Sequence, residues 1–212
     1  MEGRRPSTDW RGLRGWIGGW FLCSPLRRAA EIFFLGDLDS SYLREIEGRC
    51  PDGDETVLDL GAGSGYFSLK IARNLVGGKV VCVDLSEEML GILRGRAKRK
   101  GLENKIEVVR AHAASTGLED ESCDLAVSSG LFHELSRPKE ALAEMVRVVK
   151  PGGSVVVADF RDIRMPHGED AHGPFSLNEL TELFYKGGLI DSHVYPVGRW
   201  VVGVGRKFSS AA

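Results

Sequence analysis

Apolar residues beyond residue 50 fall into two alternating kinds of segment. Five short runs are almost continuously apolar, which is typical of strands that are covered on both faces of a sheet. The pattern predicts a largely parallel sheet between two layers of helices. The five runs are Thr56–Leu60, Lys79–Asp84, Lys105–Arg110, Cys123–Ser128 and Ser154–Phe160.

The segments between these runs repeat apolar residues every three or four positions, which is the period of an amphipathic helix. Pro138 suits the first turn of one such helix. We expect this helix to end at the sequence Lys150–Gly153. A capping box formed by Ser176 and Glu179 begins the last helix. The two clearest apolar series are Phe67, Ile71 and Leu75, and Met89, Leu93 and Ala97.

The C-terminal segment predicts a hairpin. Its strands are Ile190–Pro196 and Arg199–Lys207, with the turn around Pro196–Gly198. The whole pattern therefore predicts an α/β fold with a doubly wound, Rossmann-like sheet of seven strands. We expect the sheet to be mostly parallel, with an antiparallel C-terminal strand at its edge.

The first 50 residues combine arginines with tryptophans and other apolar residues. We interpret residues 1–50 as a helical lid or cap, and residues 51–212 as the main domain. Transient contact with a membrane surface is the second interpretation, because arginines beside tryptophans suit a lipid interface. A signal peptide is disfavoured, because the apolar segment Trp16–Cys23 is short and interrupted by glycines.

Composition narrows the class of protein. The chain has 212 residues, 42% of them hydrophobic and 27% charged, which is ordinary for a globular domain. The formal net charge of -2 gives no general attraction to nucleic acid, so we expect no such partner. The four cysteines show no CxxC pair, which favours free thiols in a reducing cytoplasm.

Three glycines follow the first predicted strand. Gly61, Gly63 and Gly65 stand at alternate positions where the chain passes from a strand into a helix. Glycines there permit positive φ angles and let a ligand approach the backbone. Tyr66 departs from the GxGxxG pattern of dinucleotide sites, because a pyrophosphate needs a small residue there. The loop therefore favours a nucleoside without phosphate.

An acidic residue ends the second predicted strand. Asp84 lies 25 residues after Asp59, at a strand tip where a carboxylate can accept both hydroxyls of a ribose. The alternative role is the N-cap of the next helix, for which Ser86 is equally suited. Leu85 and Met89 are placed to enclose a flat base, or else to fill the core.

Four segments between Thr56 and Phe160 resemble the class I S-adenosylmethionine-dependent methyltransferases, in particular the UbiE-like, methyltransferase type 11 branch of small-molecule enzymes. "VLDLGAGSGYF" resembles the first motif of that family, and "VVCVDLSEEML" its acidic second motif. "VVRAHAASTGLEDESCDLAVSSGLFHEL" resembles the third and fourth motifs. "RPKEALAEMVRVVKPGGSVVVADF" is similar to the segment that leads through the fifth strand.

The resemblance implies a site for S-adenosyl-L-methionine, with S-adenosyl-L-homocysteine as the product. Asp84 would hold the ribose hydroxyls, beside Leu85 and Met89. Ala113 would offer its N–H to an adenine ring nitrogen. The residues implied for the methionine part are Asp59, Gly61, Ala62, Gly63 and Gly65, together with Ser128 or Ser129.

His112 departs from the family pattern, because many members carry an aspartate there that accepts from the adenine amino group. A neutral imidazole nitrogen also accepts such a bond, whereas a protonated ring only donates. We therefore expect cofactor binding to weaken below about pH 6. A calorimetric affinity that stays constant from pH 5 to 8 would contradict this expectation. The alternative is a solvent-facing His112 whose neighbours bind the cofactor.

Methyl transfer is an in-line displacement that mainly needs positioning and exclusion of water. A base is needed when the acceptor arrives protonated, and His133, after the fourth strand, is the candidate; a packing role is its alternative. His167 and His172 could line an acceptor pocket, or bind a metal together with Glu169 and Asp170. Ordinary loop polarity is the favoured interpretation, and we predict no metal site. The basic run Arg94–Gly101 is interpreted as a solvated helix end.

The function expected from these features is transfer of a methyl group to a small acceptor, with an apolar acceptor favoured by the aromatic N-terminus. Two alternatives stay open, an NAD-binding oxidoreductase and a non-catalytic protein that keeps the fold. We expect a cytoplasmic monomer or homodimer.

Overall fold

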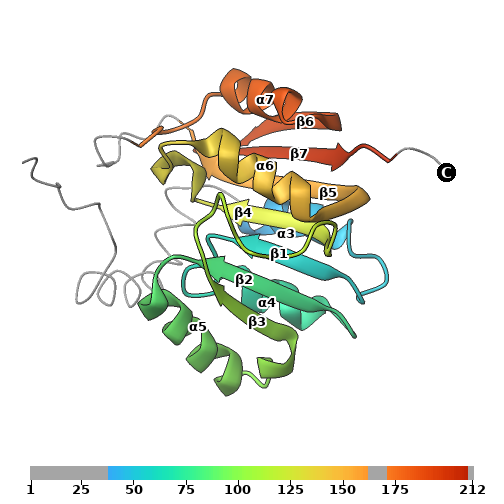
Figure 1. Ribbon diagram of the computed structural model, residues 1–212, viewed down its shortest axis with the longest axis vertical. Helices are drawn as coiled ribbons and strands as arrows, with labels where there is room; N and C mark the ends of the chain where they lie inside the picture. The colour runs from blue at the N-terminus through green and yellow to red at the C-terminus, as the bar shows by residue number, and fades with distance from the viewer. Residues whose placement is uncertain (1–37, 162–170, 210–212) are drawn as a thin grey trace, which may run out of the picture.

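A seven-stranded sheet forms the centre of the computed structural model, which describes residues 38–161 and 171–209 (Figure 1). The strand order is β3-β2-β1-β4-β5-β7-β6. The first five strands are parallel to one another, and β7 is antiparallel to both of its neighbours. The strands are β1 (Thr56–Leu60), β2 (Lys79–Asp84), β3 (Ile106–Arg110), β4 (Cys123–Ser129), β5 (Val149–Phe160), β6 (Leu189–Val197) and β7 (Trp200–Lys207).

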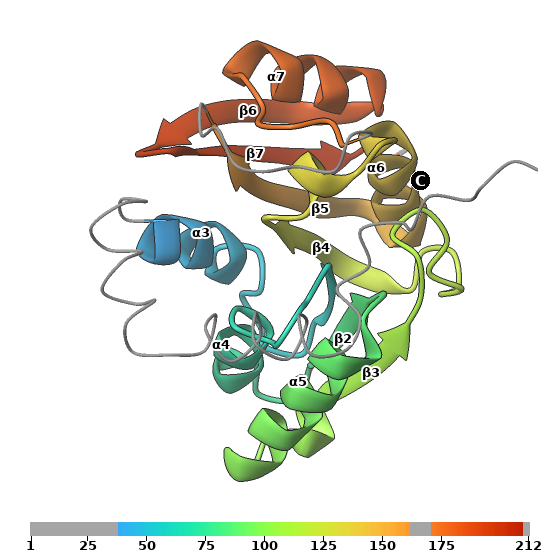
Figure 2. The same ribbon diagram turned by 90° about the vertical axis from the view of Figure 1, so that its left-hand side faces the viewer.

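Helices cover both faces of this sheet, and Figure 2 separates α3 and α4 on one side from α6 on the other. The predicted α/β, doubly wound, mostly parallel sheet with an antiparallel C-terminal strand is confirmed. The helices are α3 (Leu38–Glu47), α4 (Ser68–Asn74), α5 (Glu87–Arg99), α6 (Pro138–Val148) and α7 (Leu177–Lys186), with short 3-10 turns η1 (Glu103–Lys105) and η2 (Phe132–Glu134).

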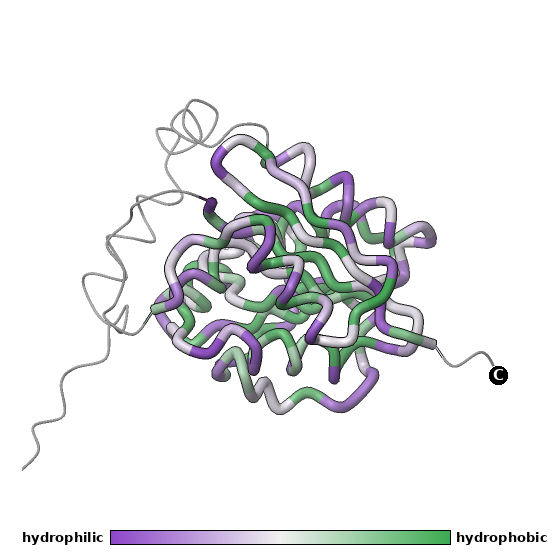
Figure 3. The backbone as a smooth tube through the Cα atoms, turned by 90° about the horizontal axis from the view of Figure 1, so that it is seen from above, coloured by the Kyte–Doolittle hydropathy of each residue, from purple (hydrophilic) through white to green (hydrophobic). Residues whose placement is uncertain are grey.

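Strand residues alternate between two hydrophobic cores. Val57 packs with residues of α3, α4 and α5, whereas Leu58 packs with residues of α6 and α7. Both side chains are fully buried. Hydrophobic segments accordingly run through the middle of the molecule in Figure 3, with hydrophilic segments along the outside. This two-sided burial is the reason that the strands are nearly continuous in apolar residues.

Two expectations about the C-terminal half were wrong. The antiparallel strand β7 lies inside the sheet, between β5 and β6, because the hairpin folds back onto β5; β6 is the edge. The sequence Lys150–Gly153 belongs to β5 and does not form a helix end. The pairing register between β4 and β5 shifts between Cys123 and Leu125, and Gly152 of β5, with a φ of 80°, lies at this shift. Gly152 and Gly153 therefore belong to the irregular first part of β5.

Helix α3 belongs to the core of the sheet domain, although we placed the domain boundary at residue 50. Tyr42 and Ile46 of α3 are buried in the same core as Val57. The earlier part of the proposed lid, residues 1–37, lies outside the described residues. No helix in the described part of the chain has the length and apolar character needed to cross a membrane.

Candidate functional site

A cavity of about 740 Å³ lies beyond the carboxyl ends of the parallel strands. Its walls come from the segments after β1, β2, β3 and β4. β1 lies between β2 and β4, so the order of the strands reverses at this place. The cavity therefore occupies the position where doubly wound sheets bind ligands, and its volume is within the range of small-molecule sites.

The glycine loop Gly61–Gly65 forms one wall of the cavity, and its three glycines have positive φ of 77°, 52° and 79°. A Cβ at Gly63 would meet no atom within 4 Å. Since Gly63 lines the cavity, this open space is available to a ligand that approaches the backbone closely. Gly61 and Ala62 also line the cavity.

Gly65 does not line the cavity, in contrast to the role implied by the family motif. A Cβ at this position would lie 2.7 Å from Cγ of Leu93 in α5. Gly65 is therefore required for the packing of the loop onto α5. Gly61 has a packing role as well, because a Cβ there would come within 2.9 Å of the Leu131 side chain.

Asp84 holds the glycine loop from the end of β2. Its Oδ2 accepts from the Gly63 N–H at 2.8 Å, and its Oδ1 accepts from the Ser86 N–H at 2.9 Å. Burial raises the pKa of Asp84. Each carboxylate oxygen keeps a second lone pair, so the group can still accept ligand hydroxyls. The N-cap of α5 is Ser86, whose hydroxyl accepts from the Met89 N–H.

Asp59 is buried at 4% exposure in the floor of the same cavity. The Ser68 hydroxyl donates to its Oδ2 at 2.5 Å. Burial raises the pKa of Asp59 to about 6, and the negative charge of Asp84 adds to the increase. A cationic ligand group beside Asp59 would lower the pKa of this carboxyl again and favour its ionised form. The position is therefore suited to bind an amine.

The four residues implied for the adenosine part of the cofactor lie at one cavity. Leu85, Met89, His112 and Ala113 all line the cavity. Met89 is 6% exposed, whereas Leu85 is 49% exposed. A flat base between them would therefore cover apolar surface that Leu85 exposes at the rim.

His112 is turned differently from the expected acceptor. Its Nδ1 accepts from the Ala114 N–H at 3.2 Å, which places the proton of the neutral ring on Nε2. The free nitrogen is then a donor, and it cannot accept from an adenine amino group. The expected loss of an adenine acceptor at His112, on which the predicted pH dependence rested, therefore has no support in this arrangement.

The two serines at the end of β4 have different positions. Ser129 lines the cavity. Ser128 is fully buried, and its hydroxyl donates to the Leu60 carbonyl oxygen at 2.9 Å. Ser128 is not among the residues that line the cavity. Its implied contact with the methionine amine is not supported.

His133 lies in the cavity wall and forms a buried pair with Asp159 at the end of β5. The distance from His133 Nδ1 to Asp159 Oδ1 is 2.7 Å. Asp159 also accepts from the backbone N–H groups of His133, at 3.2 Å, and Phe160, at 2.6 Å. These three donors identify Asp159 as the acceptor, so Nδ1 of His133 carries the proton and Nε2 offers a lone pair.

The pKa of His133 is raised despite its burial. Burial alone lowers this pKa, but the hydrogen bond and the charge of Asp159 raise it more, and Glu134 adds to the increase. Glu134 Oε1 lies 3.8 Å from Nε2. His133 therefore has the environment of an acid–base group with an orienting carboxylate.

Aromatic side chains continue the wall beyond His133. The ring of Phe160 meets His133 edge-on with centroids 4.9 Å apart, and Trp200 packs on Phe160 at 4.2 Å. Both aromatic residues line the cavity. Sequence reasoning missed them, and it also missed Asp159. A lone carboxylate in an apolar strand is a signal for Asp159, but no local signal marks Trp200, which the hairpin brings back from far along the chain.

The cavity carries an excess of negative charge. Among the residues that the structure describes, six carboxylate side chains and two guanidinium groups line it. The arginines are both at the rim, since Arg110 donates to the Leu85 carbonyl and Arg137 pairs with Glu140. The residues present fit a cationic nucleoside such as S-adenosyl-L-methionine, with open backbone at Gly63 and carboxylates at Asp59 and Asp84. The carboxylates are Asp59, Asp84, Glu87, Glu88, Glu134 and Glu140.

Of the two loop histidines, only His172 is described, and it does not line this cavity. His172 stacks on Phe175 with centroids 4.0 Å apart and lines a separate groove beside α7. His167 lies outside the described residues. Among residues 38–161 and 171–209, no cluster of three or more histidine, cysteine or acidic side chains is arranged to hold a metal ion.

Comparison with known proteins identifies relatives of this chain. The sequence model of a family described as "Methyltransferase domain" matches residues 58–157. The chain is 35% identical over 116 residues to the demethylmenaquinone methyltransferase of Clavibacter sepedonicus, a match that covers 55% of this chain and 45% of the relative. It is 39% identical over 132 residues to the ubiquinone/menaquinone biosynthesis C-methyltransferase UbiE of Escherichia coli, covering 61% and 52% respectively.

These matches cover about half the length of the two curated relatives. A solved structure described as a SAM dependent methyltransferase from Aquifex aeolicus matches with a TM-score of 0.72 and 26% identity. That match covers 90% of this chain and 96% of the other. The comparisons confirm the family that the sequence motifs indicated.

Proposed function

Because the chain belongs to the class I S-adenosylmethionine-dependent methyltransferases, we propose that it transfers a methyl group to a small, apolar, quinone-like acceptor. The names of the two curated relatives, which concern ubiquinone and menaquinone biosynthesis, support this acceptor class. The comparisons do not favour an NAD-binding oxidoreductase.

The cofactor would lie across the tips of β1 and β2. Asp84 would accept the ribose hydroxyls, the open backbone at Gly63 would receive the methionine part, and Asp59 would pair with its ammonium group. Ala113 would offer its backbone N–H to the base. The excess of carboxylates supports a positively charged ligand, since opposite charges attract across a partly desolvated cavity.

The single observation that carries the acceptor proposal is the His133–Asp159 pair beside an aromatic wall. Phe160 offers apolar surface within the same cavity, next to the histidine ring, and the buried Trp200 ring packs on Phe160 and completes this wall. An aromatic acceptor that bears a hydroxyl would satisfy both features. Its ring would stack on the wall, and its hydroxyl would donate to Nε2 of His133.

The cofactor supplies an electrophilic methyl group on a positively charged sulfur. Nε2 of His133 would take the proton of the acceptor hydroxyl, and electron density at the neighbouring ring carbon would rise. That carbon would bond to the methyl carbon as the bond from methyl to sulfur breaks. The ring carbon would then lose its hydrogen as a proton to water, which restores the aromatic ring, and the His133 imidazolium would return its proton to the acceptor oxygen. Asp159 would hold the imidazole ring and stabilise its positive charge.

We also propose that the protein works in the cytoplasm, as a monomer or homodimer, with the part of the N-terminal segment that precedes α3 as a lid over the acceptor. The described cysteines support a reducing compartment, because Cys50, Cys82 and Cys123 are free thiols. Membrane contact through the N-terminal segment stays a prediction, since residues 1–37 lie outside the described part.

The proposal is tested by transfer of a tritiated methyl group to 1,4-naphthohydroquinone under nitrogen. We expect product with the wild-type protein. We expect His133→Ala to lower kcat by about 100-fold or more, as is typical for loss of a general base. Because only the neutral histidine accepts a proton, kcat should rise with pH through a pKa above the ordinary value of about 6.5.

Two further variants sharpen this test. Asp159→Asn removes the carboxylate that raises the His133 pKa, so the rise in kcat should move to lower pH and its plateau should fall about tenfold. His172→Ala is the matched control, because His172 lies outside the cavity, and it should leave kcat unchanged. A His133→Ala enzyme with wild-type kcat and pH profile would refute the base assignment.

A further inference from the structure

The basic run Arg94–Gly101 contains an arginine that binds the glycine loop. Arg96 Nη1 donates to the Ser64 carbonyl oxygen at 2.8 Å and lies 3.3 Å from the Ser64 hydroxyl oxygen. Ser64 stands between Gly63 and Gly65 and is 5% exposed. We interpreted the run Arg94–Gly101 as a solvated helix end, but Arg96 binds the backbone of the cavity wall at Ser64.

Two of the described elements, β2 and α5, hold the glycine loop. From the end of β2, the Val83 carbonyl accepts from the N–H groups of Gly61 and Ala62, at 2.8 and 3.0 Å, and Asp84 accepts from the N–H of Gly63. From α5, Arg96 donates to the carbonyl of Ser64. The end of β2 therefore binds backbone N–H groups of the loop, whereas α5 binds the backbone carbonyl of Ser64.

Leu93 and Arg96 act together on consecutive loop residues. They are three positions apart in α5, so they lie on one face of the helix. Leu93 is fully buried against Gly65, at which a Cβ would clash with it, and Arg96 binds Ser64. Met89, one turn earlier, lines the cavity. The same helix therefore contributes to the adenosine side and supports the loop on the methionine side.

A loop with three glycines has large conformational freedom, and ordering it on binding would lower the affinity. A hydrogen bond from a charged donor is stronger than one between neutral groups. A guanidinium on the Ser64 carbonyl is thus well suited to restrict the loop before a ligand arrives.

We propose that Arg96 is a positioning residue for cofactor binding, which holds the Ser64 carbonyl so that the loop Gly61–Gly65 keeps the conformation that receives the cofactor. The inference rests on the proposed function, because that function supplies the ligand. Arg96 itself is not among the residues that line the cavity, so it acts through Ser64.

Calorimetric titration of the full chain with S-adenosyl-L-homocysteine tests this role, at a temperature where every variant is folded. We expect Arg96→Ala to raise Kd about tenfold, the effect of losing one charge-assisted hydrogen bond. Arg96→Lys should restore affinity to within about threefold of wild type, since an ammonium group also donates to a carbonyl. A purely global loss of stability would not produce this rescue.

Arg94→Ala is the matched control. Arg94 is on the same helix, but its guanidinium pairs with Glu87 of α5 at 2.7 Å and is half exposed. Its removal should leave Kd within about twofold of wild type. Equal weakening by Arg94→Ala would overturn the inference, because the effect would then come from net charge. Wild-type affinity in Arg96→Ala would also overturn it, whereas a wild-type chain that does not bind the ligand would refute the proposed function as well.

Discussion

Asp59 shows how a single residue can oppose stability and serve binding. It is buried at 4% exposure, and its neighbours within the cavity floor include a second carboxylate, Asp84. Its pKa is about 6 in the folded chain, compared with 3.8 for an unperturbed aspartate. The folded state therefore binds more protons than the unfolded state between these pH values, and stability falls as the pH rises through them. Above pH 6 the ionised group destabilises the fold by about 3 kcal/mol at most.

Asp59→Asn should therefore stabilise the protein without ligand, because the amide cannot ionise but still accepts from Ser68. We expect a gain in the free energy of unfolding that is about 1 kcal/mol larger at pH 8 than at pH 5, measured by urea denaturation. The same variant should bind S-adenosyl-L-homocysteine more weakly, since it lacks the charge that pairs with the ammonium. An Asp59→Asn protein that is less stable than wild type at pH 8 would contradict this account. Asp52 is exposed, so Asp52→Asn is the control for replacing an aspartate without burial.

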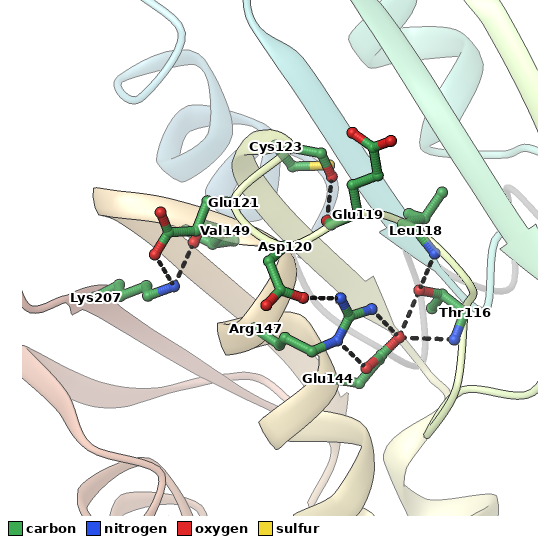
Figure 4. Close-up of polar contacts among 11 residues, drawn as sticks. Thr116, Leu118, Glu119, Asp120, Glu121, Cys123, Glu144, Arg147, Val149 and Lys207 are labelled. Atoms are coloured by element: carbon green, nitrogen blue, oxygen red, sulfur yellow. Dashed lines mark hydrogen bonds and ion pairs between the residues drawn. The ribbon is translucent and has the colours of Figure 1, made fainter.

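At the scale of elements, the connection from β3 to β4 depends on a buried glutamate of α6. Figure 4 shows Glu144 between Thr116 and Arg147. Its Oε1 accepts from the Thr116 N–H at 2.7 Å and from the Thr116 hydroxyl at 2.6 Å. Arg147 binds both oxygens of Glu144 and also contacts Asp120. Because this connection also carries His112 and Ala113, the network fixes the adenine side of the cavity from outside it.

Glu144→Gln should destabilise the fold by about 2–3 kcal/mol at pH 7, because an amide cannot accept from all of these donors. Arg147, together with Thr116, lowers the pKa of Glu144 to about 2, so its contribution is complete above pH 4.5 and is lost as the pH falls toward 2. The difference from wild type should therefore be about 1 kcal/mol smaller at pH 3.5 than at pH 7 in urea denaturation.

Glu140→Gln provides the comparison on the same helix. Glu140 forms an exposed ion pair with Arg137 at 3.0 Å, and its loss should change stability by less than about 0.5 kcal/mol. If the two glutamine variants were equally stable, the network around Thr116 would have no special role.

At the scale of the whole molecule, the cavity exists only when distant segments meet. The walls come from loops that follow β1, β2, β3 and β4, and from the hairpin residue Trp200. The unfolded chain has no such site, so a ligand that binds here stabilises only the folded state.

S-adenosyl-L-homocysteine at 100 times its Kd should stabilise the fold by about 2.7 kcal/mol and raise Tm by about 5–10 °C. NADH should leave Tm unchanged, because Tyr66 occupies the place where a dinucleotide loop requires a small residue. Asp84→Ala should reduce the shift at the same ligand concentration. A shift with NADH and none with S-adenosyl-L-homocysteine would exclude the methyltransferase proposal.

The sequence by itself determined most of the strands and helices, and it predicted the glycine loop and Asp84, which lie together at the cavity. Strands buried on both faces must be apolar throughout, so β1 and β2 were predicted with their observed bounds. The capping box at Ser176 is present, because its bonds connect residues only three apart. The glycine loop and Asp84 lie within one βα unit and the strand that follows, where local order fixes the geometry.

Only the tertiary structure decided which side chains meet across distant strands. It placed β7 inside the sheet, bonded the Ser128 hydroxyl to the Leu60 carbonyl, and joined His133 to Asp159. Pairing of strands far apart in sequence depends on the packing of the entire sheet. An apolar run in the sequence does not indicate which other strand will lie beside it. The acceptor side of the cavity is built almost wholly from such long-range contacts. For this reason the sequence alone indicated the cofactor but not the pocket for the acceptor.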